Sequence, residues 1–113
     1  MDKQANNELI ARFIGWSPDE RYEKSGIYAV WTSKEAKNAI LGSYLNYDSE
    51  WNWLMPVVDR VFKSLIGIVE DDSFRLEAKI KQSLLKVDIK ETWNWVVEYI
   101  KWYNEYKKNE GRN

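Results

Sequence analysis

The stretch DIKETWNWVVEYIKWYNEYK, residues 88–107, decides the fold because it carries more large apolar surface than any other part of the chain. Asp88 and Glu91 have the spacing of a capping box, in which two side chains accept hydrogen bonds from the free backbone N–H groups at a helix start. Lys107 and Lys108 follow where the negative end of a helix dipole favours cations. The sequence therefore predicts a long helix that is chemically marked at both ends.

At about 100° per residue, the large side chains of this helix form two stripes. The first contains the residues that a core helix would bury: Ile89, Trp93, Val96, Val97, Ile100 and Tyr103. The second stripe is aromatic and consists of Trp95, Tyr99, Trp102 and Tyr106. Together they span roughly 220°, which is wider than the stripe that covers a single core. We expect the second stripe either to be covered by the chain's own residues or to be a candidate interaction surface.

Composition limits the chemistry that the chain can carry out. Its 113 residues, 44% of them apolar, predict a single domain over residues 1–113. The chain has no Cys and no His, which excludes disulfides, thiolate nucleophiles and imidazole chemistry. Its glycines are isolated, so no phosphate-binding loop is present. Two facing carboxylates would be the remaining acid–base chemistry, but the sequence brings no pair together. We expect a non-catalytic protein without cofactor or metal.

The charge and the N-terminus indicate where the protein acts. The formal net charge of −1 gives no general attraction to a phosphate backbone. No apolar run of about 18 residues predicts a membrane span, and the N-terminus lacks the pattern of a signal peptide. We therefore expect a soluble, cytoplasmic protein that binds no membrane.

Helical spacing predicts two further helices. In the first, Leu9, Ile10 and Phe13 share one face, with Asn6 or Asn7 as the N-cap. The second runs over residues 49–65, with one broad apolar stripe of Trp51, Leu54, Met55, Val58, Val61, Phe62 and Leu65.

Strand patterns predict a small sheet beside these helices. Residues 26–32 are rich in β-forming residues, and residues 74–81 alternate strictly between apolar and charged side chains. Residues 66–69 could supply a partner strand. In the region 33–48, Ser33 could cap a short helix through Leu41, and residues 44–47 could form a brief strand. The expected fold class is α+β, with three main helices packed mainly on one face of a small antiparallel sheet.

A second function class follows from the expected strand at 74–81. Its charged face would carry Arg75, Lys79 and Lys81, which are candidate phosphate contacts. Lysines beside Trp and Tyr could bind single-stranded nucleic acid by base stacking. Glu77 interrupts this face, and the net charge supplies no electrostatic funnel. We rank nucleic acid below a protein partner or homo-oligomer.

Two blocks of the sequence resemble a known family. They are EWNWLMPVVDRV, residues 50–61, and VVEYIKWYNE, residues 96–105; a third block, residues 8–15, resembles the family's first helix. The family consists of small uncharacterised proteins, a domain of unknown function, common in Bacteroidetes genomes and their phages. This chain has Asn52 where the family tends to have Asp. The resemblance implies a compact α+β domain and a phage or mobile-element context, and no mechanism. The expected function is a non-catalytic protein-interaction or accessory module.

Overall fold

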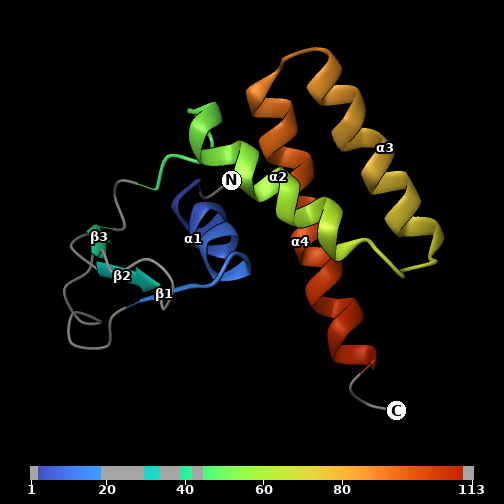
Figure 1. The fold of residues 1–113 in the computed structure, drawn as a ribbon, viewed down its shortest axis with the longest axis horizontal. Helices are drawn as coiled ribbons and strands as arrows, with labels where there is room; N and C mark the ends of the chain where they lie inside the picture. The colour runs from blue at the N-terminus through green and yellow to red at the C-terminus, as the bar shows by residue number, and fades with distance from the viewer. Residues whose placement is uncertain (1–2, 19–29, 34–38, 42–44, 111–113) are drawn as a thin grey trace.

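The computed structural model describes residues 3–18, 30–33, 39–41 and 45–110 of the chain. These residues form four helices and three short strands (Figure 1). In chain order the elements are α1 (Lys3–Phe13), β1 (Trp16–Pro18), β2 (Val30–Ser33), β3 (Ala39–Leu41), α2 (Trp51–Ser64), α3 (Asp71–Leu85) and α4 (Ile89–Glu110).

Helix α4 is the central element. The other three helices pack against it, and its C-terminal end projects beyond them (Figure 1). Its buried face combines most of the first predicted stripe with one aromatic residue of the second: Trp93, Val96, Val97, Tyr99 and Ile100. The Asp88 Oδ1 accepts a hydrogen bond from the Glu91 N–H at 3.0 Å. The Glu91 carboxylate instead approaches the Lys86 Nζ at 3.4 Å, so the predicted helix is confirmed with one half of the expected capping box.

The expected strand at residues 74–81 is wrong, because this segment is part of helix α3. Leu76 and Ile80 are four residues apart on one helical face and are buried against α4. The hydrogen bonds within α3 satisfy the backbone N–H and C=O groups of this segment, so the segment needs no partner strand. Residues 66–69, expected as that partner, form a turn and a loop between α2 and α3.

The expected α+β fold class is also wrong, because the described residues fold mainly as helices, with α1, α2 and α3 packed around α4. The strands are three or four residues long and pair antiparallel in the order β1-β2-β3. They lie beside α1 and away from α3, and among the described helices α1 makes the main contact with them (Figure 1). Residues 30–32 are in a strand as expected, whereas 26–29 are outside the described residues. Ala39–Leu41 is a strand rather than the end of a short helix, and residues 45–47 form no strand.

Helix α2 was predicted correctly, and Pro56 lies inside it. Its buried residues are Leu54, Val57, Val58 and Val61. Met55, which was assigned to the same stripe, is 43% exposed. The buried face therefore includes Val57, which was not expected, and leaves Met55 outside the core.

Helix α1 begins before the expected cap, so Asn6 and Asn7 are inside the helix and both are buried. The Asn7 Nδ2 donates to the Leu45 carbonyl at 2.8 Å and to the Asp48 Oδ1 at 3.0 Å. The Asn7 Oδ1 accepts the indole N–H of Trp93 at 2.8 Å. A single amide thus joins α1 to α4 and to the loop before α2. Among the described residues, no helix is sufficiently long and apolar to span a bilayer.

Candidate interaction surface

The predicted aromatic stripe of α4 is divided by the fold. Tyr99 has no exposed surface, and its hydroxyl lies 2.7 Å from the Ser64 Oγ at the end of α2. Burial raises the pKa of Tyr99 above its ordinary value, and the hydrogen bond to Ser64 opposes that shift. Tyr99 is therefore a core residue, and its prediction as a contact residue is wrong.

The other three residues of the stripe are half-buried and remain reachable from solvent. The Lys79 Nζ lies 5.7 Å from the centre of the Trp95 ring. Trp102 and Tyr106 stack on each other, with ring centres 5.2 Å apart and planes at 19°. Trp102 and Tyr106 belong to the C-terminal part of α4. Of the predicted stripe, these two rings are therefore nearest to the projecting end of the helix.

The most exposed large apolar side chains lie elsewhere. Two belong to the connection between α2 and α3, namely Ile66 at 81% and Val69 at 80% exposure. The others belong to α2, α3 and the turn after α3, and they are Met55, Phe74, Leu85 and Val87. Single exposed apolar residues are ordinary, whereas groups of them mark contact surfaces.

Ile66, in the connection between α2 and α3, lies next to the projecting C-terminal end of α4. A shallow pocket of about 280 Å³ is lined by Ser64, Ile66, Gly67, Ile68, Tyr103, Tyr106 and Lys107. The pocket lies between the α2–α3 connection and the ring of Tyr106, which belongs to the predicted aromatic stripe. We call Ile66, Ile68, Val69, Tyr103 and Tyr106 the loop surface. The sequence predicted a strand at residues 66–69. A short apolar run that follows a glycine and precedes an acidic turn is also compatible with an exposed loop.

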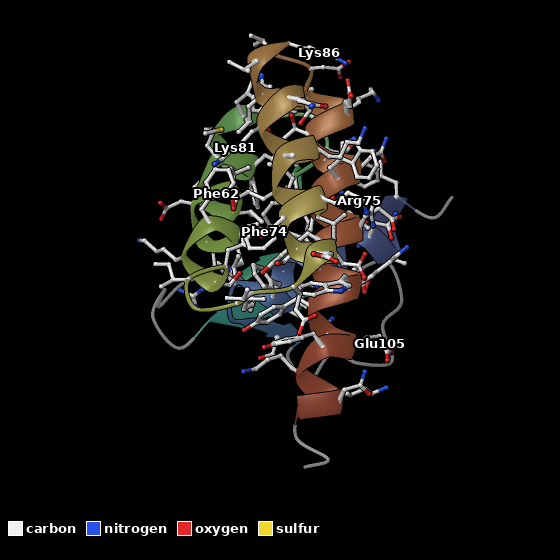
Figure 2. All side chains as sticks on the ribbon, turned by 90° about the vertical axis from the view of Figure 1, so that its right-hand side faces the viewer. Phe62, Phe74, Arg75, Lys81, Lys86 and Glu105 are labelled. Carbon is white, nitrogen blue, oxygen red and sulfur yellow. The ribbon has the colours of Figure 1, made fainter. Side chains whose placement is uncertain are left out.

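The second group lies where α3 faces α2. Figure 2 shows Phe74 and Lys81 on the side of α3 next to Phe62, with Arg75 on the other side. Both helices pack on α4 but hardly on each other. Between them, an apolar hollow of about 360 Å³ is lined by Trp51, Met55, Leu84 and Val87. We call this hollow together with Phe74, Ala78, Lys81 and Leu85 the α3 face.

The candidate phosphate contacts do not form one track, because they lie on a helix. Arg75 and Lys79 are four residues apart on one side, where Arg75 lies 3.9 Å from the Asp72 carboxylate. Lys81 points to the other side, 3.2 Å from Glu77 and 5.7 Å from the centre of the Phe62 ring. Nucleic-acid binding stays a prediction, and these three side chains do not give it a continuous basic track.

A further pocket, next to the buried Asp48, has a structural explanation. It measures about 270 Å³ and is lined by Lys3, Asp48, Lys90, Trp93 and Asn94. Its buried carboxylate, Asp48, already binds Asn7 and lies 3.6 Å from the Lys3 Nζ. Within the described residues, no group of three acidic side chains is placed to hold a metal ion.

Comparison with known proteins adds no assignment to this geometry. No family model matches the chain, and no curated protein or solved structure is similar enough to it to count as a match. The function is therefore argued from the exposed surfaces themselves.

Proposed function

We propose that the chain is a non-catalytic protein-interaction module and that the loop surface contacts its partner. The observation that carries the proposal is the exposure of Ile66 and Val69, at 81% and 80%, in the loop that borders the half-buried ring of Tyr106. Covering these side chains would remove apolar surface from water, at roughly 25 cal/mol per Å². An aromatic ring bordered by aliphatic side chains is also the usual composition of an interface centre.

The local backbone holds this surface in a defined shape. Gly67 has a φ of 88°, a left-handed conformation that glycine adopts without a steric penalty. The Ile68 N–H donates to the Leu65 carbonyl at 3.1 Å, which closes the turn after α2. The loop is thus ordered before it meets a partner, and ordering it again at binding costs little entropy.

Co-purification from the native host tests the proposal. Tagged wild-type protein is compared with the double variant Ile66→Ser, Val69→Ser, and circular dichroism checks that both are folded. We expect a defined protein to be recovered with the wild type in a stable ratio and to be lost from the double variant. Leu85→Ser is the matched control, because Leu85 is 86% exposed and lies at the opposite end of α3.

Two results would count against this proposal. In the first, no protein is recovered with the wild type above the level of an untagged strain. In the second, the double variant and the control recover the same protein equally well, which would place the contact elsewhere. The phage or mobile-element context is a separate proposal that rests on the sequence resemblance of residues 50–61 and 96–105.

A further inference from the structure

We propose that the protein pairs with a second copy of itself through the α3 face, with the two α3 helices antiparallel around a two-fold axis. This surface is distinct from the loop surface, so the inference goes beyond the proposed function. It rests on three observations: a strained exposed valine, an apolar hollow matched by an exposed ring, and the order of charges along α3.

Val87 is the first observation. The Val87 N–H donates to the Leu84 carbonyl at 3.0 Å, and the Asp88 N–H donates to the Ser83 carbonyl at 3.2 Å. This is a Schellman ending, whose left-handed position is normally glycine. Val87 occupies it with a φ of 54°, although a β-branched side chain is strained there. Its side chain is 71% exposed and gains little from the core. A valine retained under strain at an exposed position points to a contact that its side chain makes outside the monomer.

The hollow and Phe74 are the second observation. The Phe74 ring is 54% exposed on the side of α3 that faces α2 (Figure 2). The hollow lies towards the opposite end of the same helix and is lined by Leu84 and Val87 with two residues of α2. A two-fold axis that runs between the two α3 helices, at the level of Lys79 and Ile80, brings each Phe74 opposite the partner's Leu85, next to the hollow. The same operation fills both hollows, because a two-fold interface is self-complementary.

The charges along α3 are the third observation, and they select the direction. Glu70 precedes α3, Asp71 and Asp72 are in its first turn, and Lys86 caps its C-terminal end, where the Lys86 Nζ lies 3.4 Å from the Glu91 carboxylate. In the middle, the Lys81 Nζ lies 3.2 Å from the Glu77 carboxylate, so this pair leaves no net charge there. Parallel copies would bring the two acidic N-terminal ends of α3 together, and these ends would repel each other. Antiparallel copies bring Asp71 near the partner's Lys86, and they also align the helix dipoles favourably.

Sedimentation of the full chain tests the pairing. From about 1 µM to about 1 mM, a range that covers weak and moderate affinities, the average mass should rise from that of the monomer towards twice that value. Phe74→Ser and Leu85→Ser should weaken the association by at least about tenfold, as expected for residues at an interface centre. Lys101→Ser is the control, because it changes an exposed residue of α4 that lies outside both the α3 face and the loop surface, and it should leave association unaltered.

Val87→Gly separates a contact from a loss of fold. Glycine relieves the left-handed strain, so the variant should melt at a higher temperature than the wild type at low protein concentration. The same variant should nevertheless dimerise more weakly. A damaged fold cannot produce this combination, because it would lower the melting temperature.

A charge exchange tests the antiparallel direction. Asp71→Lys and Lys86→Glu each place like charges at both contacts of their own dimer and should weaken it. Mixing the two variants restores opposite charges at both contacts, so the mixture should associate more tightly than either variant alone. A chain that stays monomeric over the whole concentration range would overturn the proposal. A dimer that is insensitive to Phe74→Ser, Leu85→Ser and Val87→Gly would do so as well.

Discussion

Substitution of Asn7 tests the central polar contact of the fold. The side chain is 1% exposed and makes three hydrogen bonds, to the Leu45 carbonyl, the Asp48 carboxylate and the Trp93 indole. Asn7→Ala removes all three and leaves their partners buried. Each unsatisfied buried group costs about 1–3 kcal/mol, and we expect a total loss of about 3–5 kcal/mol because water reaches part of the space. That is a large share of the roughly 5–15 kcal/mol that stabilises a domain.

Asn7→Asp makes the prediction sharper because it adds a pH dependence. The new carboxylate still accepts from Trp93, but its second oxygen faces the Leu45 carbonyl and the Asp48 carboxylate, where the amide donated. Two facing carboxylates are stable only when they share a proton. Over the acidic range, the folded variant therefore holds more protons than the unfolded chain, so its stability increases as pH falls. The limiting slope for one proton is about 1.4 kcal/mol per pH unit.

Urea unfolding followed by Trp fluorescence measures both effects. At pH 7, Asn7→Asp should lie well below the wild type, and the difference should narrow as pH is lowered towards 4.5. Asn104→Asp is the matched control, because it makes the same change at an exposed site of α4 and should show no such narrowing. If both Asn7 variants stayed within about 0.5 kcal/mol of the wild type, as surface substitutions do, the amide would not join the helices as described.

Three further predictions concern single contacts. Asp88→Ala should lower the free energy of unfolding by about 1 kcal/mol in urea titrations, because it removes the N-cap of α4. Tyr99→Phe should cost about 1 kcal/mol through the lost hydrogen bond to Ser64, whereas Tyr106→Phe should be neutral in the same assay. Burial raises the pKa of Tyr47 to about 12, so alkaline absorbance titration should show late tyrosine ionisation that Tyr47→Phe reduces. The pKa of Tyr47 in the unfolded chain is 10.0. The stability gained by burying its neutral hydroxyl is therefore fully present below pH 10 and is lost as pH rises towards 12.

Two long periodic stretches, residues 49–65 and 88–107, could be predicted as helices because their apolar residues repeat every three to four positions. Helices α2 and α4 were placed in this way. The start of α1 could not, because Asn6 and Asn7 have the residue type of a cap. What decides their position is non-local, since Asn7 bonds to partners 38, 41 and 86 residues away. Local preference is overridden where distant polar groups need a buried partner.

The candidate site was predictable only in part, for the same physical reason. Helical spacing placed Tyr99 on one stripe with Trp95 and Trp102, and that angular position is correct. Its burial depends on Ser64 and on Phe13, whose ring lies 6.4 Å from that of Tyr99 in an edge-on contact. Spacing within one helix shows which residues share a face. It does not show where the ends of other helices cover that face.

The error at α3 and the proposed self-association have a common origin. Leu76 and Ile80 alone, four residues apart, would indicate an ordinary helix that buries one stripe. Phe74 and Ala78 add a second apolar pair, offset by two residues, and the combined pattern alternates like a strand. In the helix, the first pair is buried on α4 and the second is exposed. The residues that the structure describes leave this second pair uncovered. Its presence therefore both imitates a strand in the sequence and marks the α3 face as a surface that a second copy can cover.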